Sequence, residues 1–291
     1  MATDSNYYVP ESSKLPIFTA LGLGTMAYGA GTWVQPGGSP MIFFVGALIL
    51  AFVLYSWFSL VIKENMQGLT SPQLKRSYVW GMSWFIFSEV MFFAAFFGAL
   101  LYVRTVSSSH LEASADLLWP GFEFSWPLFE TPDMAAAGEA AKVKGPNEII
   151  DPWHLPLVNT ILLLTSSVTV HFAHTALKKD NRKMFNAWLA ATVLLAIAFL
   201  FFQVEEYVEA YNELGLTLES GIYGTTFFML TGFHGAHVTL GTIMLSIQLI
   251  RGLRGHFSHD DAFGFEASSW YWHFVDVVWV GLFIFVYVLG S

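Results

Sequence analysis

The sequence predicts an all-α membrane protein with seven transmembrane helices. Its 291 residues are 55% hydrophobic and only 12% charged, whereas soluble domains carry about 25% charged residues. Apolar segments recur along the whole chain, so this is not a soluble domain with a single anchor. There is no cysteine, which excludes disulfides and every metal centre that needs a thiolate ligand. A net charge of -9 argues against nucleic acid as a partner.

Seven apolar segments approach or exceed the roughly 20 residues that a spanning helix needs. They cover residues 17–33, 41–62, 80–103, 155–177, 185–203, 222–250 and 269–289. The first segment is short and rich in glycine and alanine, and the turn sequence Gln-Pro-Gly-Gly at 35–38 ends it. Ser71 followed by Pro72 is typical of a helix start, so we expect the third helix to begin before Trp80.

A long polar stretch, residues 104–154, separates the third apolar segment from the fourth. A loop of this length is uncommon, so we expect an insertion that lies over one face of the membrane. The chain then divides into three parts: an N-terminal tail (1–16), the first two helices with their inner loop (17–75), and a five-helix bundle that carries the insertion (76–291).

Basic residues predict the orientation of the seven helices. If the N-terminus is cytoplasmic, ten of the 13 lysines and arginines lie in inner segments, and only Arg104, Lys142 and Lys144 lie in outer ones. Inner loops are enriched in basic residues, so the sequence predicts a cytoplasmic N-terminus and a periplasmic C-terminus. The outer segments are acidic, which suits either a positively charged partner or a solvated surface.

Glu89 is a carboxylate near the middle of the third apolar segment, which contains no basic residue between 80 and 103. Phe85, Phe92, Phe93 and Phe96 share its helix face, because they lie three, four or seven positions away. We expect Glu89 to be protonated at neutral pH or bonded to a polar group on another helix. A carboxylate inside the membrane is costly, so it indicates a functional site more than a structural tie.

Three pairs of polar side chains lie three residues apart on other apolar segments, and each pair shares one helix face. They are His171 with His174, His234 with His237, and His273 with Asp276. Together with Glu89 they have the ligand types of a haem or di-metal site. They equally suit hydrogen bonding between closely packed helices, and spacing alone does not decide between the two interpretations.

Four blocks of sequence carry a family resemblance. They are SEVMFFAAFF (88–97), FFQVEEYVEA (201–210), GIYGTTFFMLTGFHGAHV (221–238) and GFEASSWYWHFVDVVW (264–279). In this order they resemble subunit III of the haem–copper cytochrome c oxidases. The long 104–154 stretch makes the chain more similar to bacterial members, of the aa3 type, than to mitochondrial ones.

The resemblance implies a fold in which the first two of seven helices splay away from a bundle of five, leaving a cleft filled by phospholipids. It implies that this chain binds no haem, copper or other metal, because those cofactors belong to partner subunits. Glu89 matches the family's carbodiimide-reactive glutamate, which modulates proton uptake or an oxygen path. Glu89, Lys63 and Trp57 are implied lipid contacts, since a cation can hold a lipid phosphate. The polar side chains are then an interhelical network, made of His171, His174, Glu206, His234, His237, His273 and Asp276.

The function implied is that of a non-redox accessory subunit of a proton-pumping terminal oxidase in a bacterial inner membrane. Such a complex oxidises cytochrome c and reduces dioxygen to water, and its subunit III sustains proton uptake and stability of subunit I. The implied partners are subunits I and II, a small fourth subunit, membrane phospholipids and cytochrome c. Two alternatives stay open: subunit III of a quinol oxidase, and an independent seven-helix transporter.

Overall fold

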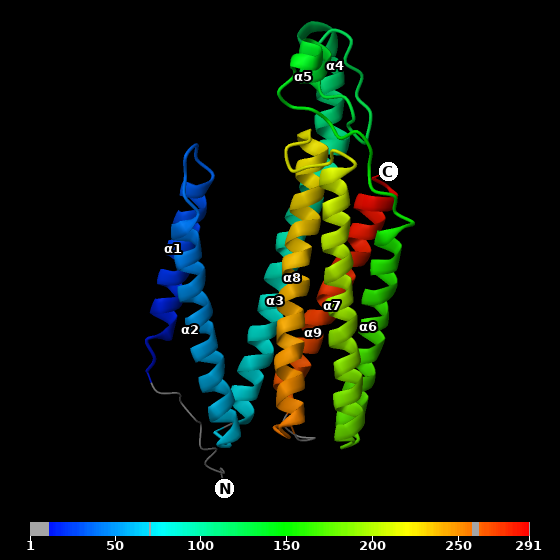
Figure 1. The fold of residues 1–291 in the computed structure, drawn as a ribbon. Coiled ribbons are helices and arrows are strands. Elements are labelled where there is room, and N and C mark those ends of the chain that lie inside the picture. The colour runs from blue at the N-terminus through cyan, green and yellow to red at the C-terminus, as the bar shows by residue number, and fades with distance from the viewer. Residues whose placement is uncertain (1–11, 70, 258–261, 291) are drawn as a thin grey trace. The chain divides into compact units, whose positions relative to one another are not determined.

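All regular secondary structure in the described part of the chain is helical (Figure 1). The structure is a computed structural model that describes residues 12–69, 71–257 and 262–290. Most of the predicted N-terminal tail, residues 1–11, lies outside the described residues. The chain forms two compact units, residues 1–80 and 81–291, and each is described by itself.

The first unit is a hairpin of two helices, α1 (Leu15–Trp33) and α2 (Met41–Met66). The turn between them forms where predicted: Gly37 has a left-handed φ of 78°, and the Gly38 amide donates to the Gln35 carbonyl at 2.8 Å. Small residues bring the helices together, because a side chain at Gly29 would overlap the backbone of Phe43, and one at Gly46 that of Met26.

Six helices in the described residues are long and apolar enough to cross a membrane, against the seven predicted. The helix that does not qualify is α1, although it is 19 residues long. Its Gly, Ala and Thr residues replace the large aliphatic side chains of a typical span. The predicted start of the third helix is confirmed, since α3 (Pro72–Tyr102) begins after Ser71, whose Oγ accepts from the Leu74 amide at 3.2 Å.

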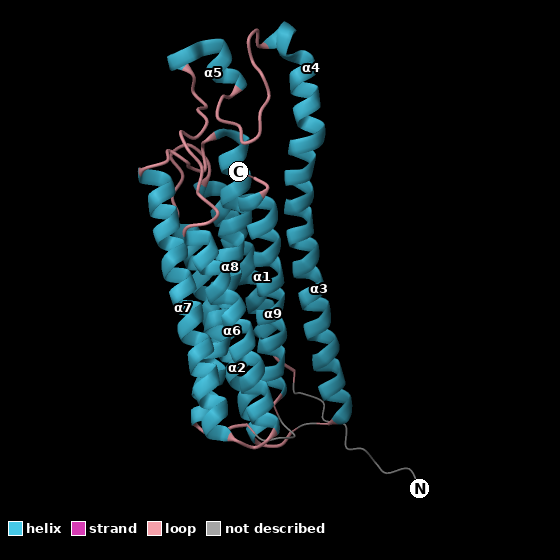
Figure 2. Cartoon of the chain, turned by 90° about the vertical axis from the view of Figure 1, so that its right-hand side faces the viewer, coloured by secondary structure: helices cyan, strands magenta, loops and turns pink. Residues whose placement is uncertain are grey.

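The second unit is built around four long helices that pack as consecutive neighbours (Figures 1 and 2). They are α6 (Leu155–Lys178), α7 (Arg182–Asn212), α8 (Gly221–Leu253) and α9 (Phe263–Leu282), the last extended by the π-helical turn η3 (Phe283–Val288). Helix α6 also contacts α9, which closes the bundle. Helix α7 runs nine residues past the predicted end at Gln203, because glutamate is a good helix former and does not stop it.

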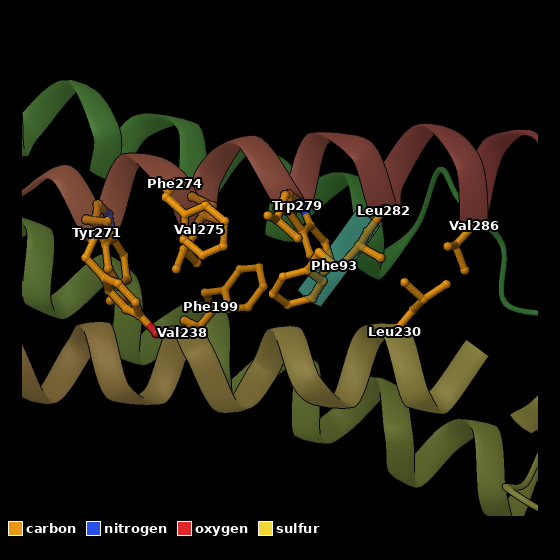
Figure 3. Packing of buried hydrophobic residues seen from close by; sticks show 14 of the residues in the cluster. Phe93, Phe199, Leu230, Val238, Tyr271, Phe274, Val275, Trp279, Leu282 and Val286 are labelled. Carbon is orange, nitrogen blue, oxygen red and sulfur yellow. The ribbon is translucent and has the colours of Figure 1, made fainter. Parts of the chain in front are cut away.

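The core of this unit lies between α7, α8 and α9, where Phe199, Val275 and Trp279 interdigitate (Figure 3). Phe93 reaches this layer from α3. Two turns before Trp279 in α9, the Trp272 indole donates to Ser166 Oγ of α6 at 2.9 Å. The Trp272 ring also packs on Gly241 of α8. Large buried aromatic rings therefore set the spacing between these helices.

The prediction that helix ends at 104 and a loop begins there is wrong. Helix α3 continues through the π-helical turn η1 (Val103–Ser107) into α4 (Ser108–Leu118), so the described helix runs from Pro72 to Leu118. No proline or glycine interrupts residues 104–118. Hydroxyls in this stretch bond back to carbonyls four residues earlier, as Ser108 does to Arg104 at 2.9 Å. Pro120 ends the helix just beyond it.

The segment beyond α4 contains α5 (Pro132–Ala137) and the short 3-10 turn η2 (Gly138–Ala140). The Asp133 carboxylate joins α5 to the stretch that follows η2, accepting from the amides of Lys142 at 2.6 Å and Val143 at 2.9 Å. The hydrogen bonds from the Val143 and Lys142 backbone amides stabilise the carboxylate and so lower the pKa of Asp133 below its usual range.

Replacing Asp133 with alanine should therefore remove the hydrogen bonds that tie α5 to Lys142 and Val143. A lowered folded pKa means that the carboxylate stabilises the segment above its ordinary pKa, and that this is lost as the pH falls through the folded value. We expect hydrogen exchange at the Lys142 and Val143 amides to speed up severalfold in D133A at neutral pH. In the wild type, the protection of these two amides should be lost when acid protonates Asp133. The exposed Glu139 supplies the control, since E139A should leave both amides protected.

Candidate functional site

A carboxyl and an imidazole meet inside the second unit. Glu89 of α3 and His237 of α8 face each other with Oε2 and Nε2 2.8 Å apart. Their side chains are 21% and 12% exposed, respectively. The predicted bond from Glu89 to a polar group on another helix is thus confirmed. Sequence reasoning identified His237 only as one of several candidates, because spacing cannot say which helix faces α3.

The second ring nitrogen of His237 decides how the pair holds its proton. Nδ1 lies 2.6 Å from the backbone carbonyl of Phe233, which can only accept, so Nδ1 carries hydrogen. If the imidazole is neutral, Nε2 has a lone pair and Glu89 must donate as a carboxylic acid. If the imidazole is charged, Nε2 donates to a carboxylate. Both arrangements contain one proton shared between Oε2 and Nε2, and the pair is neutral overall.

Aromatic rings surround this shared proton. Phe93 meets the His237 ring edge-on at 4.9 Å between centroids, and Phe92 lies 5.9 Å away. Phe85, predicted on the same face as Glu89, stacks on Tyr271 of α9, and Phe96 packs on Phe233. An apolar, polarisable shell of this kind strengthens the bond between the two groups, because the local dielectric is low.

The other predicted polar residues bond to separate partners and do not converge on one centre. His174 Nε2 lies 3.3 Å from Glu266 Oε1, a partner that sequence reasoning missed. His234 is fully buried with Nε2 3.2 Å from the carbonyl of Val275. His171 is exposed beside Phe172 of its own helix and does not join the others.

Two further contacts complete the set of predicted polar residues. His273 Nδ1 lies 2.8 Å from Ser167 Oγ, with Asp276 Oδ2 3.6 Å from the same nitrogen. The Tyr287 hydroxyl donates to Glu206 Oε1 at 2.6 Å. Within the described ranges, no group of three or more histidine, aspartate or glutamate side chains is placed to hold a metal ion.

The remaining predicted lipid contacts lie in the first unit. Lys63 is exposed in the last turn of α2, and Trp57 of the same helix is 37% exposed. An apolar groove of about 590 Å³ runs along the hairpin between α1 and α2. It is lined by Leu15, Phe18, Leu48, Ile49, Phe52, Val53 and Ser56.

Comparison with known proteins gives one consistent family. A family profile described as cytochrome c oxidase subunit III matches residues 5–291. Cytochrome c oxidase subunit 3 of Drosophila melanogaster is 38% identical, with all of both chains covered. The subunit 3 of Prototheca wickerhamii is 39% identical over 87% of this chain and 86% of its own, and that of Oryctolagus cuniculus 35% identical over 98% and 97%. The chain therefore belongs to the cytochrome c oxidase subunit III family.

Proposed function

We propose that this chain is the non-redox accessory subunit of a proton-pumping terminal oxidase, where it sustains proton uptake and stability of subunit I. The observation that carries the proposal is the Glu89–His237 pair, which holds one proton in an aromatic shell. Family membership supports an oxidase subunit over an independent transporter.

The pair can affect proton uptake without conducting protons through the whole subunit. Because it is neutral in both of its forms, moving the proton between Oε2 and Nε2 changes the local dipole but not the net charge. A group of this kind holds a steady electrostatic environment for a proton-accepting carboxylate in a neighbouring subunit. Removing one member of the pair would leave the other without its partner. An unsatisfied buried polar group costs about 1–3 kcal/mol, and the 21% and 12% exposure of these side chains places the cost toward the low end.

The proposed architecture in the membrane has seven spans, with α1 as the seventh. In the proposed arrangement the N-terminus is cytoplasmic, the C-terminus is periplasmic, and the division of the chain is 1–16, 17–75 and 76–291. The first two helices splay from the other five and leave a cleft for phospholipids. The exposed Lys63 in the last turn of α2 supports this by offering a cation to a lipid phosphate, and Trp57 of the same helix is partly exposed.

The proposed complex is of the bacterial aa3 type, in the inner membrane. Its partners are subunits I and II, which hold the haem and copper, a small fourth subunit, and cytochrome c as electron donor. A quinol oxidase is the second candidate. Metal analysis of the purified complex separates the two, since a copper centre in subunit II accompanies cytochrome c oxidation.

Replacing Glu89 with glutamine in the intact complex tests the proposed role. Gln cannot share the proton with His237, so we expect slower proton uptake during turnover and a severalfold shorter catalytic lifetime. Stopped-flow pH recording and the time course of oxygen consumption measure the two effects. The matched control is E205Q, because Glu205 is exposed on α7. If E89Q keeps the wild-type uptake rate and lifetime, Glu89 is only structural and the proposed role is wrong.

A further inference from the structure

Glu206 of α7 is a second carboxyl inside the membrane bundle, and its surroundings differ from those of Glu89. Its side chain is fully buried. Oε1 accepts from the Tyr287 hydroxyl at 2.6 Å and from Gln203 Nε2 at 3.3 Å. Oε2 is also buried, and among the described residues it has no hydrogen-bond partner. Oε1 of this carboxyl thus accepts two hydrogen bonds, and Oε2 has no hydrogen-bond partner among the described residues.

The described residues offer Glu206 no compensating cation. The titratable groups that act on it are Tyr207 and Glu209 from its own helix and Tyr287 from η3, and none of them is basic. Basic residues on α7 are at the opposite end, with Lys183 being 23 residues or about 35 Å away. A carboxylate here would be an uncompensated buried charge, which costs several kcal/mol.

Arg104 is a cation that contacts η3 through backbone carbonyls. Arg104 donates to the carbonyls of Leu289 at 2.7 Å and Phe285 at 3.5 Å. Both bonds go to backbone carbonyls, so the Arg104 guanidinium is held at the end of η3. Tyr287 contacts Glu206 through its neutral hydroxyl.

Other buried polar atoms without a partner lie on α7 and α6. Gln203 Oε1 and both amide atoms of Asn159, from α6, are buried without a partner among the described residues. The register of α6 and α7 is fixed where Thr169 Oγ1 meets Thr192 Oγ1 at 2.8 Å. Counting ten residues from this contact along each antiparallel helix brings Asn159 level with residue 202, next to Gln203.

We propose that Glu206 is a neutral carboxylic acid in an internal hydration site, where bound water links Glu206 Oε2 to Gln203 and Asn159. Buried polar groups are nearly always satisfied, and internal water commonly bridges them with two to four hydrogen bonds. The acid donates from Oε2 to water. Water in turn donates to the carbonyl oxygens of Gln203 and Asn159, and the Asn159 amide donates back. The site makes Glu206 a second protonatable centre, reached by water and separate from Glu89.

Infrared spectroscopy of the intact oxidase complex tests the protonation state. We expect E206Q to remove a carboxylic-acid carbonyl band that is present at neutral pH. Y287F should shift this band, because Oε1 loses its strongest donor while the ring remains. The matched control is E209Q, a less buried acid three residues along the same helix, which should leave the band in place. If E206Q removes no acid band, Glu206 is ionised and the proposal is wrong.

Deuterium exchange and a density map test the water. The band should move to lower frequency in D₂O, and N159L should alter that shift, since the bridging water loses a partner. A map of the complex at a resolution that shows ordered water should contain density between Glu206 and Asn159. A band that stays unshifted in D₂O, or a map with an empty space there, would overturn the hydration site even if the acid is neutral.

Discussion

Replacing Trp279 with alanine is expected to destabilise the second unit by about 3–5 kcal/mol, the range for removing a large aromatic side chain from a packed core. Trp279 is fully buried in α9, where Figure 3 shows it beside Phe199, and it contacts α6, α7 and α8. Its ring lies 4.8 Å from Phe199 and 5.1 Å from His234 between centroids. Its indole donates to Thr160 Oγ1 at 2.9 Å. No single neighbour can fill the space that the indole leaves, because each neighbouring side chain is anchored on a packed helix.

Reversible unfolding in mixed micelles measures this loss. Trp84→Ala is the matched control, because Trp84 of α3 is 64% exposed in the same unit and its removal opens no internal cavity. Trp279→Phe keeps most of the packing but removes the bond to Thr160, so its cost should be smaller than that of alanine. Equal stability of the Trp279→Ala and Trp84→Ala variants would show that the packing around Trp279 does not hold α9 in place.

A valine at Gly46 is expected to force α1 and α2 apart, with a cost of about 1–3 kcal/mol or more. A side chain there would overlap the backbone of Met26, and one at Gly29 would overlap the backbone of Phe43. A flexible side chain could move aside, but a helix backbone can do so only if the whole helix shifts. G46V and G29V should therefore both loosen the hairpin, and the double variant should not cost much more once the helices have separated.

Crosslinking or spin-label distances between α1 and α2 report this separation directly. Gly31→Val is the matched control, since it lies on α1 two residues from Gly29, and a side chain there meets nothing within 4 Å. G31V should leave the distance between the helices unchanged. An unchanged distance in G46V would contradict close packing of the hairpin through its glycines.

The helices themselves were largely predictable, because their signals are local. Apolar runs of sufficient length, the Ser71–Pro72 helix start and the turn at 35–38 are read from neighbouring residues, and all three are present in the structure. The errors have local causes as well. Residues 104–118 are polar but contain no helix breaker, so polarity was mistaken for a helix end, whereas it marked only the end of the apolar surface.

The candidate site was predictable as a set of residue types but not as a set of contacts. A carboxylate at Glu89 required a polar partner wherever it was buried, and the sequence contained several histidines that could serve. Three-residue spacing placed His234 and His237 on one helix face, yet the first turns to the Val275 carbonyl and the second to Glu89. The spacing of residues in the sequence tells which side chains share a face of one helix. Which neighbouring helix that face contacts depends on how the helices pack against one another.

By itself the sequence determined that this protein is helical, membrane-spanning and of the subunit III family, since composition, run length and sequence blocks such as residues 264–279 are properties of the chain. Only the tertiary structure decided that Glu89 meets His237, that Glu206 meets Tyr287, and that Thr169 meets Thr192 between α6 and α7. The physical reason is that each of these contacts joins helices far apart in sequence. Their meeting depends on the rotation and register of whole helices, which buried rings such as Trp279 and close approaches such as Gly241 fix.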